Sequence, residues 1–235
     1  MAEQETYKVI DVFAGPGGLG EGFAAFSHGA ENPSFRLALS IEKDPTAHST
    51  LLLRSFYRQF DPKIIPPEYW SYARGEITKA ELFDFYPQEA KAAAEEAQCI
   101  KLGKTPAHEV KNLISQRLNG SKKWVLAGGP PARHIRLSGA RMRTTNPDFE
   151  DDVRHFLYKE YLRIIADHRP PVFVMENVKG ILSAQHSGKK IIESILSDLR
   201  KPDVAVNSQS SVLGYHCFRW WITNPLKNVS QKIFW

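Results

Sequence analysis

The stretch between residues 7 and 23 constrains the fold most, because an apolar run breaks into closely spaced glycines and then resumes with a helical pattern. Residues 7–13 are short, rich in β-branched and aromatic side chains and apolar apart from Asp11, which predicts a strand buried on both faces of a parallel sheet. The glycines that satisfy a G-x-G-x-x-G spacing are Gly15, Gly17 and Gly20. They allow a sharp turn, close approach of a ligand to backbone N–H groups and tight packing of the next helix.

A second apolar run, residues 35–41, ends in Glu42, which follows the last glycine at the distance expected of a ribose-binding acid, about 20 residues. An acidic side chain at this strand end can accept hydrogen bonds from both ribose hydroxyls. We therefore predict a nucleoside-containing cofactor at the glycine loop. The alternative is that the glycines form an ordinary turn and that Glu42 is a surface residue.

Composition limits the classes of protein to which the chain can belong. Its 235 residues, 42% hydrophobic and 24% charged, suit one sizeable globular domain. No apolar run is long enough to span a membrane and the first residues are acidic, so we expect a cytoplasmic protein. The two cysteines, Cys99 and Cys217, have no metal-ligand spacing and predict neither a zinc site nor a disulfide framework. The net charge of +5 is compatible with a polyanionic partner.

The middle of the chain is predicted to be mainly helical. A helix is expected to begin after Asp44, because an Asp-Pro start precedes an apolar stripe. The prolines in residues 62–67 indicate a loop, residues 78–98 have the composition of an alanine- and glutamate-rich helix, and residues 106–118 predict another helix. We expect residues 60–120 to include a helical insertion whose charged side chains form a solvated face.

Two further strands are predicted in the second half of the chain. Residues 122–127 form the first and end in a Gly-Gly-Pro-Pro sequence, and residues 172–175 form the second and end in Glu-Asn-Val. Apolar residues at helical spacing over 149–168 predict a crossover helix between them. This alternation predicts an α/β fold with a doubly wound, mostly parallel sheet, in which the strand ends that carry these motifs meet at the ligand-binding edge.

Three separated stretches, read together, resemble one known family. In chain order they are Asp11-Val12-Phe13-Ala14-Gly15-Pro16-Gly17-Gly18-Leu19, Gly128-Gly129-Pro130-Pro131 and Glu176-Asn177-Val178. They resemble the cofactor loop, the entrance to the catalytic loop and the catalytic glutamate motif of DNA (cytosine-5)-methyltransferases. The resemblance extends over about residues 7–190 and implies the Rossmann-like fold of S-adenosylmethionine-dependent methyltransferases.

The resemblance also implies a reaction: transfer of a methyl group from S-adenosylmethionine to C5 of a cytosine flipped out of double-stranded DNA. In the family a cysteine after Pro-Pro attacks C6 of the base, and the glutamate of Glu-Asn-Val holds and protonates N3. The catalytic positions implied here are Glu176, Asn177 and Ala132, which stands where the cysteine is expected. The implied cofactor-binding residues are Phe13, Ala14, Gly15, Gly17, Gly18, Leu19, Glu42 and Pro130. No metal is implied.

The chain departs from the family at the catalytic loop. The residues after Pro131 are Ala-Arg-His-Ile-Arg in place of a cysteine followed by glutamine, a small residue, an aromatic residue and serine. A methyl side chain cannot act as a nucleophile, and His134 cannot be assumed to replace a thiolate. We therefore predict that the chain is inactive in methyl transfer.

The form of this departure suggests a frame slip. If Cys-Gln-Ala-Tyr-Ser were encoded by TGC CAG GCA TAT TCG, loss of the first T would give GCC AGG CAT ATT CG, which encodes Ala-Arg-His-Ile-Arg. The hypothesis is that a paired insertion and deletion, in the gene or in its sequencing, produced residues 132–136, with the frame restored near residues 139–141. Five unrelated substitutions are the alternative.

The end of the chain is the second departure. Residues 205–235 show neither strand alternation nor helical periodicity, and the family's Gln-Arg-x-Arg motif, target-recognition domain and last cofactor motif are not found there. The predicted organisation is thus an S-adenosylmethionine-binding catalytic domain over residues 1–204 and an irregular tail over residues 205–235.

Three functions follow from the sequence. The first is a cytosine-5 methyltransferase by descent that is inactive as written, with double-stranded DNA and a cognate restriction endonuclease system as the partners that the resemblance implies. The second is a non-catalytic regulatory homologue that binds S-adenosylmethionine or DNA. The third, a nucleotide-binding oxidoreductase, is disfavoured because such an enzyme has no need for Pro-Pro and Glu-Asn-Val at successive strand ends.

Overall fold

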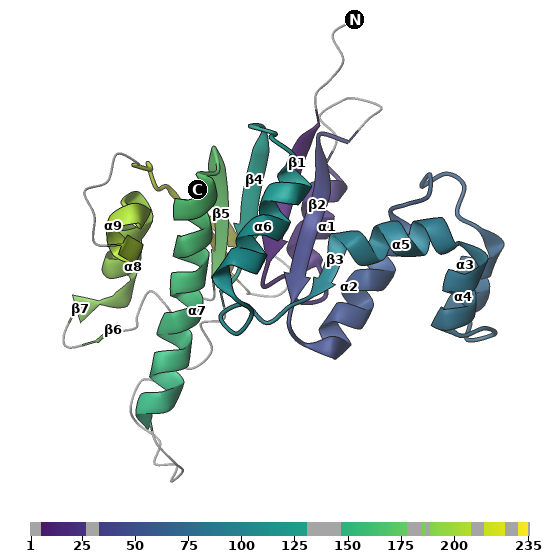
Figure 1. Cartoon of the computed structure of the whole chain (residues 1–235), viewed down its shortest axis with the longest axis horizontal. Coiled ribbons are helices and arrows are strands. Elements are labelled where there is room, and N and C mark those ends of the chain that lie inside the picture. Colours follow the sequence, from purple (N-terminus) through teal and green to yellow (C-terminus); the bar gives the residue numbers. More distant parts are fainter. Residues whose placement is uncertain are drawn as a thin grey trace, which may run out of the picture. The chain divides into compact units, whose positions relative to one another are not determined.

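A computed structural model of the chain describes residues 6–26, 33–130, 147–177, 185–186, 189–207, 214–223 and 230–234. The chain divides into two compact units (Figure 1), Met1–Lys101 and Leu102–Trp235. They are called unit 1 and unit 2, and each is described by itself.

Unit 1 contains three parallel strands in the order β3-β2-β1. They are β1 (Tyr7–Val12), β2 (Phe35–Glu42) and β3 (Ala97–Cys99). The side chains of Val9, Ile10, Leu39 and Ile41 are inaccessible or nearly so, which confirms the prediction of strands buried on both faces. The structure adds β3, which the sequence did not predict because its three residues directly follow an alanine-rich helical segment.

The helices of unit 1 begin where local signals place them. They are α1 (Gly18–Ala24), α2 (Pro45–Tyr57), α3 (Pro67–Ala73), α4 (Lys79–Phe85) and α5 (Pro87–Glu96). Asp44 caps α2 as predicted: its carboxylate accepts the N–H groups of Thr46 at 3.0 Å and Ala47 at 2.8 Å. Thr78 and Glu81 form a reciprocal capping box at the start of α4.

The helical insertion differs from its prediction in two respects. The single helix expected over residues 78–98 is divided into α4 and α5, because Pro87 starts a new helix and lacks the N–H that would continue the old one. The loop predicted around residues 62–67 leads directly into the short helix α3.

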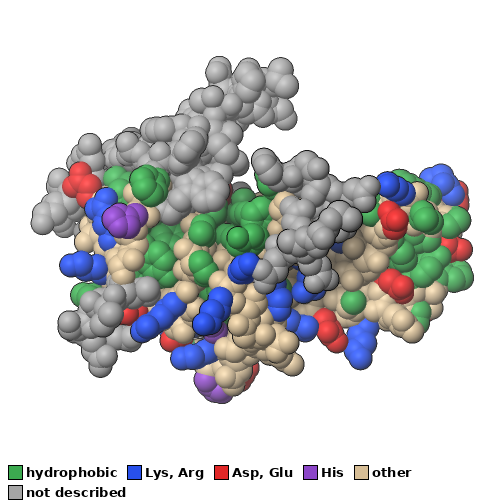
Figure 2. Space-filling view, turned by 90° about the horizontal axis from the view of Figure 1, so that it is seen from above, with side chains coloured by type: hydrophobic (Ala, Val, Ile, Leu, Met, Phe, Trp, Pro, Cys, Tyr) green, Lys and Arg blue, Asp and Glu red, His purple; other side chains and the backbone are tan. Residues whose placement is uncertain are grey.

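The helices α3, α4 and α5 of the insertion share a small apolar core with α2. It is built on Phe56, Leu82 and Ala93, against which partly buried side chains pack, among them Phe60, Tyr69, Phe83 and Tyr86. In Figure 1, α3 and α4 lie beyond α2 and α5, away from the strands of unit 1. Hydrophobic and acidic side chains are mixed on this end of the unit, at the right in Figure 2. Ile64, Trp70 and Phe85 are among the exposed ones.

Unit 2 places a parallel strand pair against a long helix. Its elements are α6 (Ala107–Leu118), β4 (Trp124–Gly128), α7 (Pro147–His168), β5 (Val172–Asn177), β6 (Gln185–His186), β7 (Lys189–Lys190), α8 (Ile191–Arg200), α9 (Pro202–Asn207), β8 (Arg219–Thr223) and β9 (Ser230–Phe234). Strands β4 and β5 are parallel, with Gly128 in register with Met175. The hydroxyl of the buried Tyr161 on α7 donates to the backbone oxygen of Val174 at 3.2 Å. The predicted α/β class with a mostly parallel sheet and a crossover helix is thereby confirmed.

The last part of unit 2 is more regular than the sequence indicated. In place of an irregular tail, β9 pairs antiparallel with β5, and β8 pairs antiparallel with β9. The division into two compact units falls in the sequence between Lys101 and Leu102, and the catalytic domain expected over residues 1–204 stays a prediction. Among the described helices, none is long and apolar enough to cross a membrane.

Candidate active site

The glycine loop joins β1 to α1 through a tight turn. Three of its residues have positive φ angles: Phe13 at 58°, Gly15 at 57° and Gly17 at 91°. Gly17 donates its N–H to the backbone oxygen of Ala14 at 2.9 Å, and Ala14 donates to the backbone oxygen of Ile41 on β2 at 3.0 Å. A positive φ costs a non-glycine residue energy, so Phe13 marks the strained backbone that is typical of binding loops.

The glycines differ in what surrounds them. A Cβ atom at Gly17 would lie 2.8 Å from Leu51 Cδ1 of α2, and one at Gly20 would lie 3.0 Å from Leu37 Cδ1 of β2. These two glycines therefore allow the start of α1 to pack closely on its neighbours. Among the described residues, a Cβ atom at Gly15 or Gly18 would meet nothing within 4 Å, so there is space beside the loop at both positions.

Glu42 holds the glycine loop in place. It is 9% exposed, its Oε2 accepts the N–H of Gly15 at 2.8 Å, and its Oε1 accepts the N–H of Asp44 at 2.8 Å. Each carboxylate oxygen has a second lone pair, so both can still accept a hydrogen bond from a ligand hydroxyl. Glu42, which is predicted to bind ribose, thus supports the glycine loop, a role that the spacing of residues did not reveal.

Asp11 is a buried carboxyl behind the loop. It is 1% exposed, and neither of its oxygens makes a hydrogen bond within the described part of the chain. Burial raises its pKa to about 7, although the charge of Arg58 opposes the shift. The only sequence signal for Asp11 was that it is a polar residue between apolar residues of its strand.

Cys99 lies at the end of β3, in register with Glu42 of β2. The N–H of Ile100 donates to the backbone oxygen of Glu42 at 3.0 Å, and the Cys99 side chain is exposed. One of the two cysteines thus lies beside Glu42 of unit 1, a neighbour that sequence separation gave no means of predicting. Within the described residues, no group of three or more His, Cys, Asp or Glu side chains could hold a metal ion.

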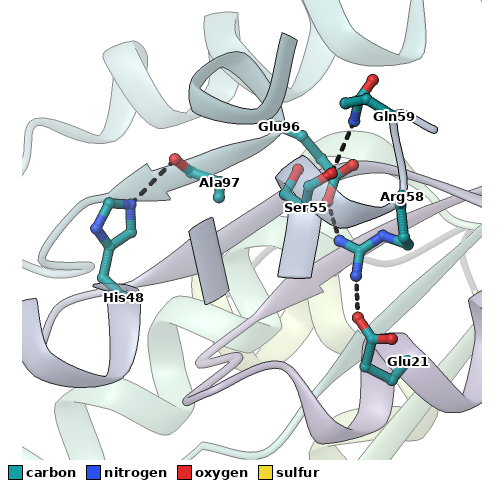
Figure 3. Close-up of polar contacts among 7 residues, drawn as sticks. All are labelled: Glu21, His48, Ser55, Arg58, Gln59, Glu96 and Ala97. Atoms are coloured by element: carbon teal, nitrogen blue, oxygen red, sulfur yellow. Dashed lines mark hydrogen bonds and ion pairs between the residues drawn. The ribbon is translucent and has the colours of Figure 1, made fainter. Parts of the chain in front are cut away.

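Arg58, at the C-terminal end of α2, connects α1 with the helical insertion (Figure 3). Its guanidinium forms ion pairs with Glu21 of α1 and Glu96 of α5. Burial raises the pKa of Glu96, and the nearby charge of Arg58 opposes this shift. Figure 3 also shows His48 Nε2 of α2 at 3.1 Å from the backbone oxygen of Ala97 on β3. The prediction that the charges of the insertion form a solvated face is wrong for Glu96, because its side chain is 11% exposed and paired.

Unit 2 holds the second group of predicted residues. Glu176 lies near the carboxyl end of β5, and Gly129 and the buried Pro130 follow β4. Glu176 is partly buried, and burial raises the pKa of its carboxyl. Asn177 ends β5, in register with Lys232 of β9. Ala132 and the loop over residues 132–136 lie outside the described residues, as does the side chain of Asn177.

The residues of unit 1 fit a nucleoside cofactor with a cationic end. The space beside the loop at Gly15 and Gly18 gives a ligand access to the backbone, and Glu42 retains acceptor capacity for hydroxyl groups. Asp11 adds an unpaired buried carboxyl behind the loop. This donor and acceptor set is compatible with S-adenosylmethionine, which carries ribose hydroxyls and positive charge.

Comparisons with known proteins assign the family. The fold and the glycine loop define a Rossmann-like α/β protein, and the family model of C-5 cytosine-specific DNA methylase matches residues 89–209, just over half of the chain. The chain therefore belongs to the C-5 cytosine-specific DNA methylase family. This assignment confirms the resemblance found in the sequence.

Among its relatives, Type II methyltransferase M.Bpa9945I of Bacillus paralicheniformis is 31% identical in an alignment of 195 positions that covers 75% of this chain and 42% of that protein. Type II methyltransferase M.AquIA of Picosynechococcus sp. is 29% identical, over 83% of this chain and 57% of that protein. The chain thus spans about half the length of these curated relatives. A solved structure of Entamoeba histolytica methyltransferase EhMeth has a TM-score of 0.45 and 13% identity, covering 98% of this chain and 52% of that one.

Proposed function

We propose that this chain is a DNA cytosine-5 methyltransferase homologue that binds S-adenosylmethionine in unit 1 and does not transfer the methyl group. The observation that supports binding best is the hold of Glu42 on the glycine loop, which keeps Gly15 and its neighbours in a turn open to a ligand. The residue that argues against methyl transfer is Ala132, which stands where the family has its nucleophilic cysteine.

When bound, S-adenosylmethionine supplies an electrophilic methyl group. Glu42 accepts hydrogen bonds from the ribose hydroxyls, and residues 13–19 bind the methionine side. Glu176 holds N3 of the cytosine, and its raised pKa favours the protonated form that can donate there. Without a thiolate at position 132 no bond forms to C6, so C5 does not become nucleophilic enough to accept the methyl group.

The proposed nucleic-acid partner is double-stranded DNA with the target cytosine flipped out. The proposed location is the cytoplasm, and the names of Type II methyltransferases among its relatives favour a role beside a cognate restriction endonuclease. The second candidate function is a non-catalytic regulatory homologue that keeps cofactor or DNA binding. The alanine at position 132 is the observation that favours it.

Titration calorimetry tests binding. We expect S-adenosylmethionine to bind to the chain and NADH to give no heat. The matched variant is Glu42→Ala, which removes the acceptor for Gly15 N–H and should weaken binding at least tenfold. If the unsubstituted chain does not bind S-adenosylmethionine, the proposal is refuted, because only the similarity of its fold to methyltransferases would then support cofactor binding.

Methyl transfer from tritiated S-adenosylmethionine to unmethylated genomic DNA tests the second half of the proposal. We expect no tritium in DNA above background with the unsubstituted chain or with Ala132→Ser. Residues 132–136 changed to Cys-Gln-Ala-Tyr-Ser should restore measurable transfer. Turnover by the unsubstituted chain would contradict the proposed inactivity. The nucleotide sequence of codons 130–142 would separately decide whether a frame slip produced this loop.

A further inference from the structure

Gly129 and the side chain of Glu176 lie next to each other at the ends of β4 and β5. Gly128 is in register with Met175, so the residues that follow them are also neighbours. A Cβ atom at Gly129 would lie 2.8 Å from Oε2 of Glu176 and 3.4 Å from its backbone oxygen. The nearest atoms to that position all belong to Glu176, whose carboxylate therefore takes the room that a side chain at position 129 would need.

The backbone does not require glycine at this position. The glycines with positive φ in the described residues are Gly15, Gly17, Gly75, Gly103 and Gly120. Gly129 is not among them, so its φ is one that alanine adopts without strain. The reason for a residue without a side chain at position 129 is therefore the space that the Glu176 side chain occupies.

Among the residues that the structure describes, packing against Gly129 is the contact that positions the Glu176 carboxyl. Within the described part of the chain it makes no hydrogen bond or ion pair, and burial is the cause of its raised pKa. A carboxyl held in this way is sensitive to the volume beside it. One methyl group at position 129 would overlap the end of a flexible side chain, which can move without unfolding the strands.

We propose that Gly129 is a positioning residue for Glu176: the missing side chain lets the carboxyl lie against the end of β4, where Pro130 begins the catalytic loop. The role in catalysis rests on the proposed function, whereas the placement of the carboxyl does not. Alanine at position 129 moves the carboxyl outward into solvent and away from the cytosine, while β4 and β5 remain paired.

The test compares Gly129→Ala with Gly214→Ala in the full chain. Gly214 is in the same unit, also lacks a positive φ, and has only the backbone oxygen of Arg200, at 3.9 Å, near its Cβ position. The pKa of Glu176 is measured by carbon-13 NMR of the labelled carboxyl. We expect Gly129→Ala to lower this pKa toward the ordinary value and Gly214→Ala to leave it unchanged. An unchanged Glu176 pKa in a folded Gly129→Ala protein overturns the proposal.

Catalysis gives a second readout in the protein with residues 132–136 restored. We expect Gly129→Ala to lower kcat about 10- to 100-fold, because small misplacements of catalytic groups have effects of this size. The affinity for S-adenosylmethionine, measured by calorimetry, should not change. In a Glu176→Ala background, Gly129→Ala should have no further effect on residual kcat. Independent effects of the two substitutions would refute positioning, whereas an inactive restored protein would count against the proposed function and leave the NMR result decisive.

Discussion

Replacement of Arg58 by methionine should destabilise unit 1, because it leaves the carboxylate of Glu96 buried without its partner. The Arg58 and Glu96 side chains are 15% and 11% exposed, whereas that of Glu21 is 38% exposed. The contact with Glu21 is therefore screened by solvent and contributes little. Most of the effect comes from Glu96, whose pKa is already raised by burial.

The magnitude follows from the cost of removing one member of a buried ion pair, about 3–5 kcal/mol. Partial exposure of the cluster favours the lower end, roughly 3 kcal/mol, which corresponds to a fall of about 6–12 °C in Tm for a protein of this size. The variant can relieve the cost by protonating Glu96. Because the folded-state pKa of Glu96 is raised, the variant should be less destabilised near pH 5 and progressively more as the pH rises toward the folded-state pKa.

Differential scanning calorimetry at pH 5 and pH 7.5 measures both effects. The double variant Arg58→Met/Glu96→Gln should recover most of the lost stability, because no buried charge remains without a partner. Arg74→Met removes the exposed Arg74–Glu76 pair and should leave Tm unchanged. A loss in Arg58→Met that equals the change in Arg74→Met, or that does not depend on pH, would show that the reasoning about Glu96 is wrong.

Three further substitutions examine the glycine loop. Gly17→Ala should cost about 1–3 kcal/mol and weaken S-adenosylmethionine binding in calorimetry, because φ is 91° and the new methyl group would meet Leu51 at 2.8 Å. Glu42→Gln should cost about 1.5–3 kcal/mol in urea unfolding, because a charged acceptor for the N–H of Gly15 is lost. The folded-state pKa of Asp11 is raised to about 7 from 3.8, so the free energy of unfolding should fall as the pH rises from 4 to 7, by up to about 4 kcal/mol. Asp11→Asn should abolish this dependence, and a pH profile unchanged by the substitution would contradict the assignment.

The parts of the fold that could be predicted are those encoded locally. The Asp44-Pro45 pair contains both the cap and the first residue of α2, and the structure shows the expected hydrogen bonds to Asp44. The glycine loop was equally predictable, because its turn depends on residues that tolerate positive φ. The strand ends at Glu42 and Glu176 could be located because a polar residue terminates an apolar run in each case.

The parts that could not be predicted depend on contacts between residues far apart in sequence. Strand β3 has three residues and is defined by its pairing with Ser40–Glu42, and β9 is defined by its pairing with β5. The charge pattern alone could not identify Glu96, 38 residues away, as the ion-pair partner of Arg58. The overlap of Gly129 with Glu176 likewise exists only once β4 and β5 are adjacent.

The contacts of the glycine loop explain how binding and chemistry can be separated in one chain. Phe13 and the two glycines with positive φ are held by Glu42 and by the pairing of Ala14 with Ile41, all within unit 1. This turn is therefore held by contacts of the protein itself, which reduces the ordering that a ligand has to supply. None of these contacts involves residues 132–136, so under the proposed function the alanine at position 132 would remove the reaction and leave these contacts of the glycine loop in place.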